Sequence, residues 1–168
     1  MCFYHDTIID LIFYILSKDN NYIKNINKGN AFDKIIRNYH QFNGAGEKVY
    51  RNKSRIIKHY KFTNDAFSEY KNNNIKNLYY EHLIPVNIIK KRLFDLNEIN
   101  TKKIKKILNE NEVIVLTKSQ AKILDGIYKN TIPNKFKDRM AYMQSIKKFK
   151  LSFNYHTETI ENCLFKIK

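Results

Sequence analysis

Apolar residues recur at helical spacing in the first part of the chain. Residues three and four positions apart share one face of a helix, so the repeat predicts one buried helix over residues 3–17 and a second over 31–42. Between them, residues 19–30 predict a polar connector, and the glycine-containing residues 43–47 predict a loop. The apolar positions of the two helices are Phe3, Ile8, Ile9, Leu11, Ile12, Ile15 and Leu16, then Phe32, Ile35, Ile36 and Tyr39.

The middle of the chain changes from helical patterns to the first strand-like pattern. Residues 50–71 predict helix in two pieces, with Asn64 or Asp65 as the cap of the second piece. Residues 76–82 predict a strand. Pro85 then suits the first position of a helix, where a missing backbone N–H costs nothing. The helix predicted over 86–96 has its apolar positions at Val86, Ile89, Leu93 and Leu96.

Two helices flank the clearest strand of the chain. Residues 97–111 predict an amphipathic helix that Thr101 or Asn100 caps. The run EVIVLT, 112–117, predicts a strand, and the helical spacing that follows extends from Lys118 to about residue 128. Residues 134–148 predict a further helix, and the tail from Leu151 is left unassigned.

These elements predict an α+β fold that is mainly helical, in a single domain. The 168 residues are enough for one compact domain and hardly two. Four Gly and two Pro are few, and this scarcity favours helices. Along the chain we expect a helical N-terminal scaffold at 1–75, a small core that contains both strands at 76–126, and a helical C-terminal extension at 127–168.

The net charge of the chain indicates the kind of partner that it binds. The formal net charge is +15 with a pI near 9.7, and a surface this positive repels itself unless an anionic partner neutralises it. Nucleic acid is the first candidate partner and a membrane surface the second. The excess of Lys and Arg is spread along the chain rather than gathered in a tail, so the folded body itself should be positive. The alternative is that the charge reflects solubility and codon bias alone.

Cysteine usage and the N-terminal pattern indicate a cytoplasmic setting. Cys2 and Cys163 stand far apart and outside any CxxC or Cys/His cluster, so the sequence predicts neither a disulfide framework nor a structural zinc site. The apolar start contains His5, Asp6 and Asp10 and has no basic leading segment, which makes it a poor signal peptide. It is also too short and too charged to be a membrane span.

The candidate chemistry lies where the first strand ends. Glu81 and His82 are adjacent there, in the segment YEHLIP, 80–85, and Pro85 follows three residues after the histidine. Two ionisable side chains at the tip of a strand have no use in a core. The alternative is a chance pair, since a lone histidine is often structural.

The order strand, Glu-His, inserted helices, strand, helix resembles the HNH, or ββα-metal, endonuclease family. The resemblance rests on YEHLIP, 80–85, and on VIVLTKS, 113–119, and it covers about 50 of the 168 residues. It implies a small ββα-metal core within residues 76–126, interrupted by a helical insertion. It also implies metal-dependent hydrolysis of phosphodiester bonds in DNA, as in restriction, phage or mobile-element enzymes.

Family roles pass to this chain residue by residue. The resemblance implies that His82 is the general base that activates water and that Glu81 is a metal ligand. The orienting residue before the second strand would be Asn111, with Asn109 next. On the following helix Gln120, Ala121 and Lys122 are poor ligands, and Asp125, a turn further on, is the candidate for the second metal ligand if the helix is displaced. The implied cofactor is one divalent cation, Mg²⁺ first, with Mn²⁺, Ni²⁺ and Zn²⁺ as alternatives.

Basic side chains near this motif are candidates to hold a nucleic-acid backbone. Lys and Arg contact phosphates irrespective of base sequence. The default alternative is a solvated face of an amphipathic helix. The expected partner is DNA rather than RNA, with no membrane, and self-association as a homodimer is an alternative. The predicted contacts are Lys90, Lys91, Arg92, Lys102, Lys103, Lys105, Lys106, Lys118 and Arg139.

Three other functions stay open beside the endonuclease. A non-catalytic nucleic-acid-binding protein would keep the fold and the charge and need no third ligand. A metal-independent ribonuclease toxin would use His82 with Glu81 or a lysine. A basic interaction protein would bind an acidic protein instead of nucleic acid.

Overall fold

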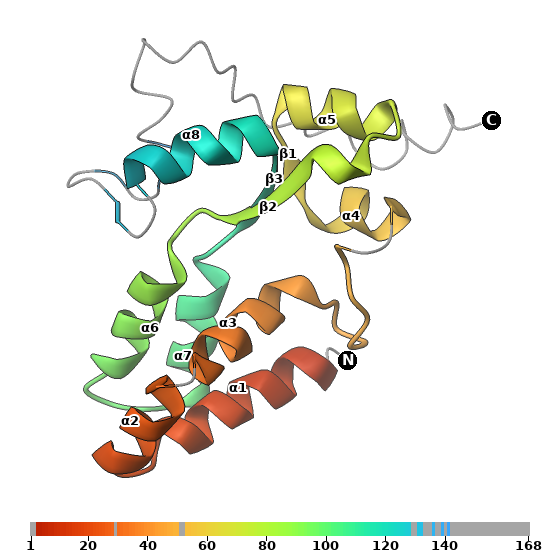
Figure 1. Cartoon of the computed structure of the whole chain (residues 1–168). Coiled ribbons are helices and arrows are strands. Elements are labelled where there is room, and N and C mark those ends of the chain that lie inside the picture. Colours follow the sequence, from red (N-terminus) through yellow and green to blue (C-terminus); the bar gives the residue numbers. More distant parts are fainter. Residues whose placement is uncertain are drawn as a thin grey trace. The chain divides into compact units, whose positions relative to one another are not determined.

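The computed structural model describes residues 3–28, 30–50, 53–128, 131–132, 136, 139 and 141. By its internal contacts the chain forms two compact units. The helical unit comprises Met1–Val49 and Ile84–Glu112, and the sheet unit comprises Tyr50–Leu83 and the chain from Val113 onward. Figure 1 shows the elements of both units. The boundaries at 75/76 and 126/127 that the sequence predicts do not coincide with these limits.

Helices α1, α2, α3, α6 and α7 build the helical unit. Helix α1 packs on α3 and α7, and α3 packs on α2 and α6. These contacts bury the apolar stripes that the sequence pattern predicts, and burial of such stripes supplies most of the stability of short helices. The bounds are α1 Phe3–Leu16, α2 Asn20–Lys28, α3 Ala31–Gln41, α6 Val86–Phe94 and α7 Thr101–Asn109. The fully buried side chains include Ile12, Phe32, Ile36, Ile89, Leu93, Ile104 and Leu108.

The sheet unit is built around a sheet that, in the described residues, has the strand order β1-β3-β2. Strand β3 is central, antiparallel to β2 and parallel to β1, and all of its residues are buried. Helix α8 packs on β2 and β3, while α5 packs on β1, β2 and β3. The bounds are α4 Lys53–His59, β1 Lys61–Phe62, α5 Asn64–Lys71, a 3₁₀ helix at Ile75–Asn77, β2 Leu78–His82, β3 Val113–Thr117 and α8 Lys118–Tyr128.

Most of the predicted elements are confirmed. The fold is α+β and mainly helical, with a small sheet. Helices α1, α3, α6, α7 and α8 and strands β2 and β3 lie where the patterns predict them. Asn100 caps α7, since its side chain accepts a hydrogen bond from the Lys103 backbone N–H. The helix predicted over 134–148 and the tail from 151 fall outside the described residues, except for 136, 139 and 141.

Two local predictions are wrong. Residues 19–30 are not a connector: they contain α2, whose start is fixed by a hydrogen bond from the Tyr22 N–H to the Asp19 carboxylate at 2.8 Å. The cap of α5 is Thr63, whose hydroxyl accepts from the Ala66 N–H, and not Asn64 or Asp65. The start of a helix at Pro85, by contrast, is confirmed: Pro85 is the N-cap of α6, whose first residue is Val86.

Strand β1 was missed for a physical reason. Lys61 and Phe62 are too few to show the alternation that identifies a strand. They are extended because their backbone pairs with Ile114 and Val115 of β3. This pairing places α4 and α5 in the sheet unit rather than in an N-terminal scaffold.

Among the described helices, none combines the length and the apolar character that crossing a membrane requires.

Candidate functional site

Glu81 and His82 are the last two residues of β2, as the sequence predicts. In the ladder with β3, Glu81 pairs with Ile114 and His82 pairs with Val113. Both side chains are buried: Glu81 is 8% exposed and His82 4% exposed. The structure therefore places the expected general base and metal ligand inside the sheet unit rather than on its surface.

The Glu81 carboxylate is paired with Arg139. The Arg139 guanidinium forms an ion pair with Glu81 Oε1, and its Nη2 also donates to the backbone oxygen of His82 at 3.1 Å. The Arg139 backbone N–H donates to the oxygen of Leu83 at 3.1 Å. With 3% of its surface exposed, Arg139 is as buried as its partners. The sequence predicts a phosphate contact for Arg139, but the structure gives it an interior position.

Helix α8 brings Asp125 to the same guanidinium. The helix begins at Lys118, directly after β3, and Thr117 at that end of β3 pairs with Leu78, the first residue of β2. Glu81 and His82 thus lie at the opposite end of the sheet. The helix from Lys118 to Asp125 spans about 10 Å along its axis. This length brings Asp125 to the end of the sheet where Glu81 lies. Asp125 Oδ1 lies 3.7 Å from Arg139 Nη1, on a partly exposed side chain.

This arrangement does not fit a divalent cation while Arg139 is in place. Among the residues that the structure describes, there is no group of three or more His, Cys, Asp or Glu side chains that could hold a metal ion. Glu81 and Asp125, the two predicted ligands, both face the guanidinium. A cation that takes oxygen ligands at about 2.1 Å would need the space that this guanidinium fills.

Asn111 and Asn109, the candidates for the orienting residue, make hydrogen bonds within the helical unit. The buried Asn111 accepts from the Ile84 N–H at 2.9 Å, which fixes the turn before α6. Asn109 Oδ1 accepts from the Tyr39 hydroxyl at 2.7 Å and so ties α7 to α3. Both amides thus have a structural role in the helical unit.

Tyr80, the neighbour of Glu81, is a neutral packing residue. Its ring lies against Tyr50 and Tyr60, and its hydroxyl donates to the Tyr50 backbone oxygen at 3.3 Å. Burial raises the pKa of Tyr80 to about 12, so the phenol stays protonated at physiological pH. A tyrosinate base is therefore not available at this position.

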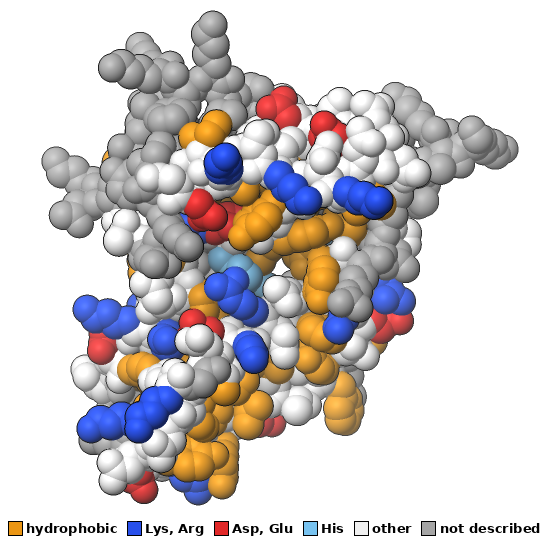
Figure 2. All heavy atoms as spheres, viewed as in Figure 1, with side chains coloured by type: hydrophobic (Ala, Val, Ile, Leu, Met, Phe, Trp, Pro, Cys, Tyr) orange, Lys and Arg blue, Asp and Glu red, His pale blue; other side chains and the backbone are white. Residues whose placement is uncertain are grey.

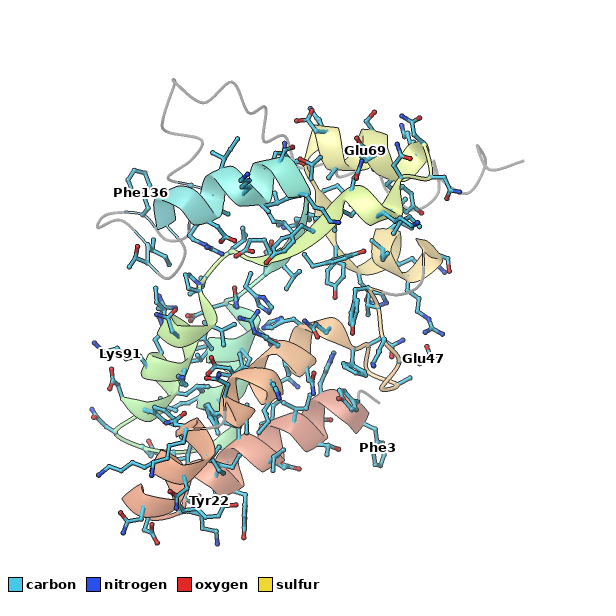
Figure 3. The ribbon with its side chains drawn as sticks, in the orientation of Figure 1. Phe3, Tyr22, Glu47, Glu69, Lys91 and Phe136 are labelled. Carbon is cyan, nitrogen blue, oxygen red and sulfur yellow. The ribbon has the colours of Figure 1, made fainter. Side chains whose placement is uncertain are left out.

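Besides Arg139, four of the predicted phosphate contacts have acidic neighbours. In these four pairs the positive charge is partly neutralised by the protein itself, which weakens attraction to an outside anion. By contrast, Lys91, Lys102, Lys106 and Lys118 are exposed and form no ion pair in the described part of the chain, and Lys91 points outward from α6 (Figure 3). The paired residues are Lys90 with Asp33 at 2.7 Å, Arg92 with Glu110 at 3.3 Å, Lys103 with Glu98 at 2.7 Å and Lys105 with Asp6 at 3.7 Å.

The sheet unit carries most of the positive charge. It contains 18 Lys and Arg against 7 Asp and Glu, a net +11, while the helical unit contains 13 against 9, a net +4. Figure 2 shows Lys and Arg side chains on the surface of both units. Exposed lysines of the sheet unit that form no ion pair with a described residue are Lys58, Lys71, Lys76, Lys118 and Lys122. Of these five, sequence reasoning selected only Lys118. The sum of charges over residues 50–83 and 113–168 would have shown that this unit is the more basic one, but not which of its lysines are exposed.

The described acidic residues of the sheet unit have partners other than its exposed lysines. Asp65 accepts from the Gln120 amide at 2.8 Å, and Glu69 accepts from the Asn77 amide at 3.3 Å. Glu81 and Asp125 both face Arg139. These are all the acidic side chains in the described part of this unit, and none of them forms an ion pair with its exposed lysines.

A buried hydrogen-bond network defines the other end of the sheet. Gln120 Oε1 accepts from the Thr63 hydroxyl at 2.8 Å and from the Thr117 N–H at 3.0 Å. These contacts join the start of α5 to the start of α8. Lys118 follows Thr117, and Lys76 comes two residues before Leu78, the partner of Thr117 in the ladder. The network thus fixes the start of α8, the helix that carries Lys118 and Lys122.

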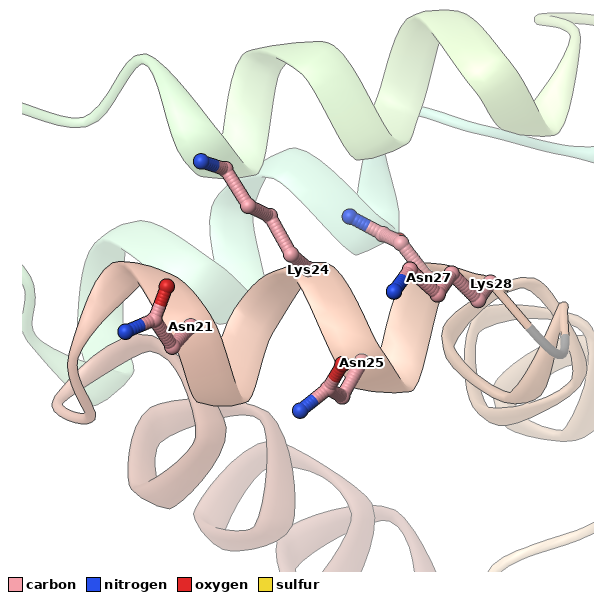
Figure 4. Close-up of a pocket in the computed structure, with 5 residues that line it drawn as sticks. All are labelled: Asn21, Lys24, Asn25, Asn27 and Lys28. Carbon is pink, nitrogen blue, oxygen red and sulfur yellow. The ribbon is translucent and has the colours of Figure 1, made fainter.

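The helical unit has one shallow polar pocket on α2, which Figure 4 shows. Its volume is about 520 Å³, and its described lining is Asn21, Lys24, Asn25, Asn27 and Lys28. The buried Asn27 Oδ1 has no hydrogen-bond partner among the described residues. All five described lining residues belong to α2 and are Asn or Lys, so this lining offers no carboxylate, imidazole or thiol.

No family model matches the chain, and the comparisons with curated proteins and with solved structures found no similar protein. Function is therefore inferred from the chain's own residues.

Proposed function

We propose that this protein binds nucleic acid through the exposed lysines of its sheet unit, without base specificity. The observation that carries the proposal is the separation of charges in this unit. Its described acidic side chains are engaged by Arg139 and by neutral amides, whereas Lys58, Lys71, Lys76, Lys118 and Lys122 are exposed. Unpaired lysines on a folded surface are the groups that release counterions when they meet phosphates.

The arrangement at one end of the sheet supports a defined binding surface. Lys118 and Lys122 are four residues apart on α8, so they lie on one side of the helix within about 6 Å at Cβ. Lys76 belongs to the same end of the sheet, because the strands on which the two segments border are paired there. We call Lys76, Lys118 and Lys122 the sheet-end lysines. Contacts of this kind fix a phosphate backbone without reading its bases.

The test compares two matched triple variants. In K76Q/K118Q/K122Q the sheet-end lysines are replaced by neutral glutamine, and in K91Q/K102Q/K106Q three exposed lysines of the helical unit are replaced in the same way. Binding of a fluorescent duplex is followed by anisotropy between about 50 and 200 mM salt. We expect the first variant to lower the slope of log K against log salt by about 3, roughly one per lost phosphate contact. The second should change it by less than about 1.

Thermal unfolding serves as the control for both variants, since substitutions of exposed lysines should leave stability within about 0.5 kcal/mol. A larger effect of K91Q/K102Q/K106Q on the salt dependence would instead assign the binding surface to helices α6 and α7. Absence of any salt-dependent binding by the unchanged protein would refute the proposal and favour an acidic protein partner.

A second candidate function is metal-dependent DNA cleavage of the HNH type. One observation favours it: β2, β3 and α8 occur in the expected order, and they bring Glu81, His82 and Asp125 to one end of the sheet. Because the guanidinium of Arg139 occupies this place, we derive no catalytic step from it. Nicking of plasmid DNA with Mg²⁺ or Mn²⁺ that His82→Ala abolishes would support this candidate. RNA cleavage in EDTA would favour a metal-independent ribonuclease instead.

A further inference from the structure

At the buried end of β2, oxygen atoms from three residues surround the guanidinium of Arg139. The guanidinium meets the Glu81 carboxylate and the His82 carbonyl through Nη2, and it approaches Asp125 through Nη1. The backbone of the same residue is fixed on the Leu83 carbonyl. All of these contacts lie within the sheet unit, and they join Arg139 to the end of β2 and to α8.

The positions of these oxygen atoms match the planar guanidinium group. The oxygens face two different nitrogens of one guanidinium, whereas a small divalent ion requires its oxygen ligands to converge on a single point. Arginine keeps its charge at any physiological pH and is less strongly hydrated than an ammonium group, so it is the side chain that best tolerates burial beside a carboxylate. A buried Glu81 without a positive partner would be strongly unfavourable.

We propose that Glu81, Asp125 and the His82 carbonyl form a guanidinium-binding site that the chain fills with its own Arg139, in the place where the sequence predicts a metal ion. Arg139 is then a positioning residue that is itself held at the end of β2 by these contacts. Divalent cations have no role in the stability of this site. The inference does not depend on the proposed function, because protein stability alone reads it out.

The experiment removes the arginine and returns a small guanidinium. Arg139→Ala should lower the melting temperature by about 10 °C, since loss of one partner leaves a buried carboxylate uncompensated. Millimolar methylguanidinium should restore about 4 °C of this loss once its concentration is ten times its Kd. Mn²⁺ and Mg²⁺ at the same concentration should leave both the unchanged protein and R139A where they were.

Two further variants separate the site from general salt effects. The double variant R139A/E81Q lacks the buried charge, so methylguanidinium should no longer raise its melting temperature. Arg139→Lys keeps a positive charge but lacks the fork, and should be less stable than the unchanged protein. If R139A does not fold, the same comparison is made on its refolding with and without methylguanidinium.

The outcomes decide the proposal. A rise in the melting temperature of R139A with methylguanidinium, lost in R139A/E81Q, supports it. A larger rise with Mn²⁺ than with methylguanidinium, or a Mn²⁺ response in the unchanged protein, overturns it in favour of a metal site. Equal stability of R139A and the unchanged protein, or failure of methylguanidinium to stabilise or refold R139A, also overturns it.

Discussion

The helical unit and the sheet unit treat their charged side chains differently. In the helical unit, four lysines and arginines lie beside acids, as in the pairs of Lys90 with Asp33 and Lys103 with Glu98, while others such as Lys91 form no ion pair with a described residue. In the sheet unit, the described acids face Arg139 or neutral amides, and lysines such as Lys118 and Lys122 remain exposed. Net charge therefore does not locate a binding surface: local pairing decides which positive charges an outside polyanion can meet.

The two units also differ in how they are held together. The helical unit stacks amphipathic helices whose stripes the local sequence defines. The sheet unit depends on pairing between distant segments, with β1 and β2 on either side of β3. Its polar interior, from Thr63 and Gln120 at one end to Glu81 and Arg139 at the other, has to be satisfied by precise partners.

The largest expected effect tests whether the units are separate. Ile114 in β3 and Ile12 in α1 are both fully buried, and truncation of either to alanine should cost about 2–5 kcal/mol. In hydrogen exchange, we expect Ile114→Ala to lower the protection of amides in the sheet unit and Ile12→Ala that of amides in the helical unit.

Ile123→Ala is the control, because 38% of Ile123 is exposed and its truncation should cost little. A uniform loss of protection over both units in either variant would show that they unfold as one cooperative body, and the comparison of two units would fail.

The next effect concerns pH and the helical unit. Burial, and to a smaller extent the nearby His5, lower the pKa of His40 to about 4 from its ordinary value of 6.5. The folded state thus favours the neutral ring, so its contribution is complete above pH 6.5 and is lost as the pH falls toward 4. We expect a loss of up to about 3 kcal/mol over this range.

Denaturant unfolding at neutral pH and near pH 4.5 measures this loss, and His40→Gln should remove most of the difference between the two conditions. His59→Gln provides the control, since His59 is exposed on α4 of the sheet unit. An unchanged pH dependence in His40→Gln would assign the acid sensitivity to other groups.

The smallest effect compares one helix cap from each unit. Thr63 is buried, caps α5 and also donates to Gln120, so Thr63→Ala should cost about 2 kcal/mol. Asn100 caps α7 with a single bond to the Lys103 N–H, and Asn100→Ala should cost about 1 kcal/mol.

Chemical denaturation of the two variants gives the comparison, and Thr63→Ser should recover part of the loss because it keeps the hydroxyl. Equal costs for the two caps would mean that the Gln120 network contributes nothing to the stability of the sheet unit.

Local patterns were sufficient for most helices but not for the site. The run VIVLT and the stripes of α1, α3 and α7 carry their own periodicity, so they were predicted correctly. Helix α2 was missed because its residues are mostly Asn and Lys, with only Ile23 and Ile26 to mark a face. Glu81 and His82 were correctly placed at a strand end, but no pattern in the sequence shows that Arg139, more than fifty residues later, pairs with Glu81.

Taken alone, the order of residues determined the positions of the main helices and of strands β2 and β3, the positive charge and the adjacency of Glu81 and His82, because these follow from local periodicity and composition. The tertiary structure decided the partners: that β1 exists, that Arg139 stands between Glu81 and Asp125, and which lysines have no ion pair with a described residue. The physical reason is that burial and pairing are properties of segments far apart in the chain, and these segments meet only when the sheet forms.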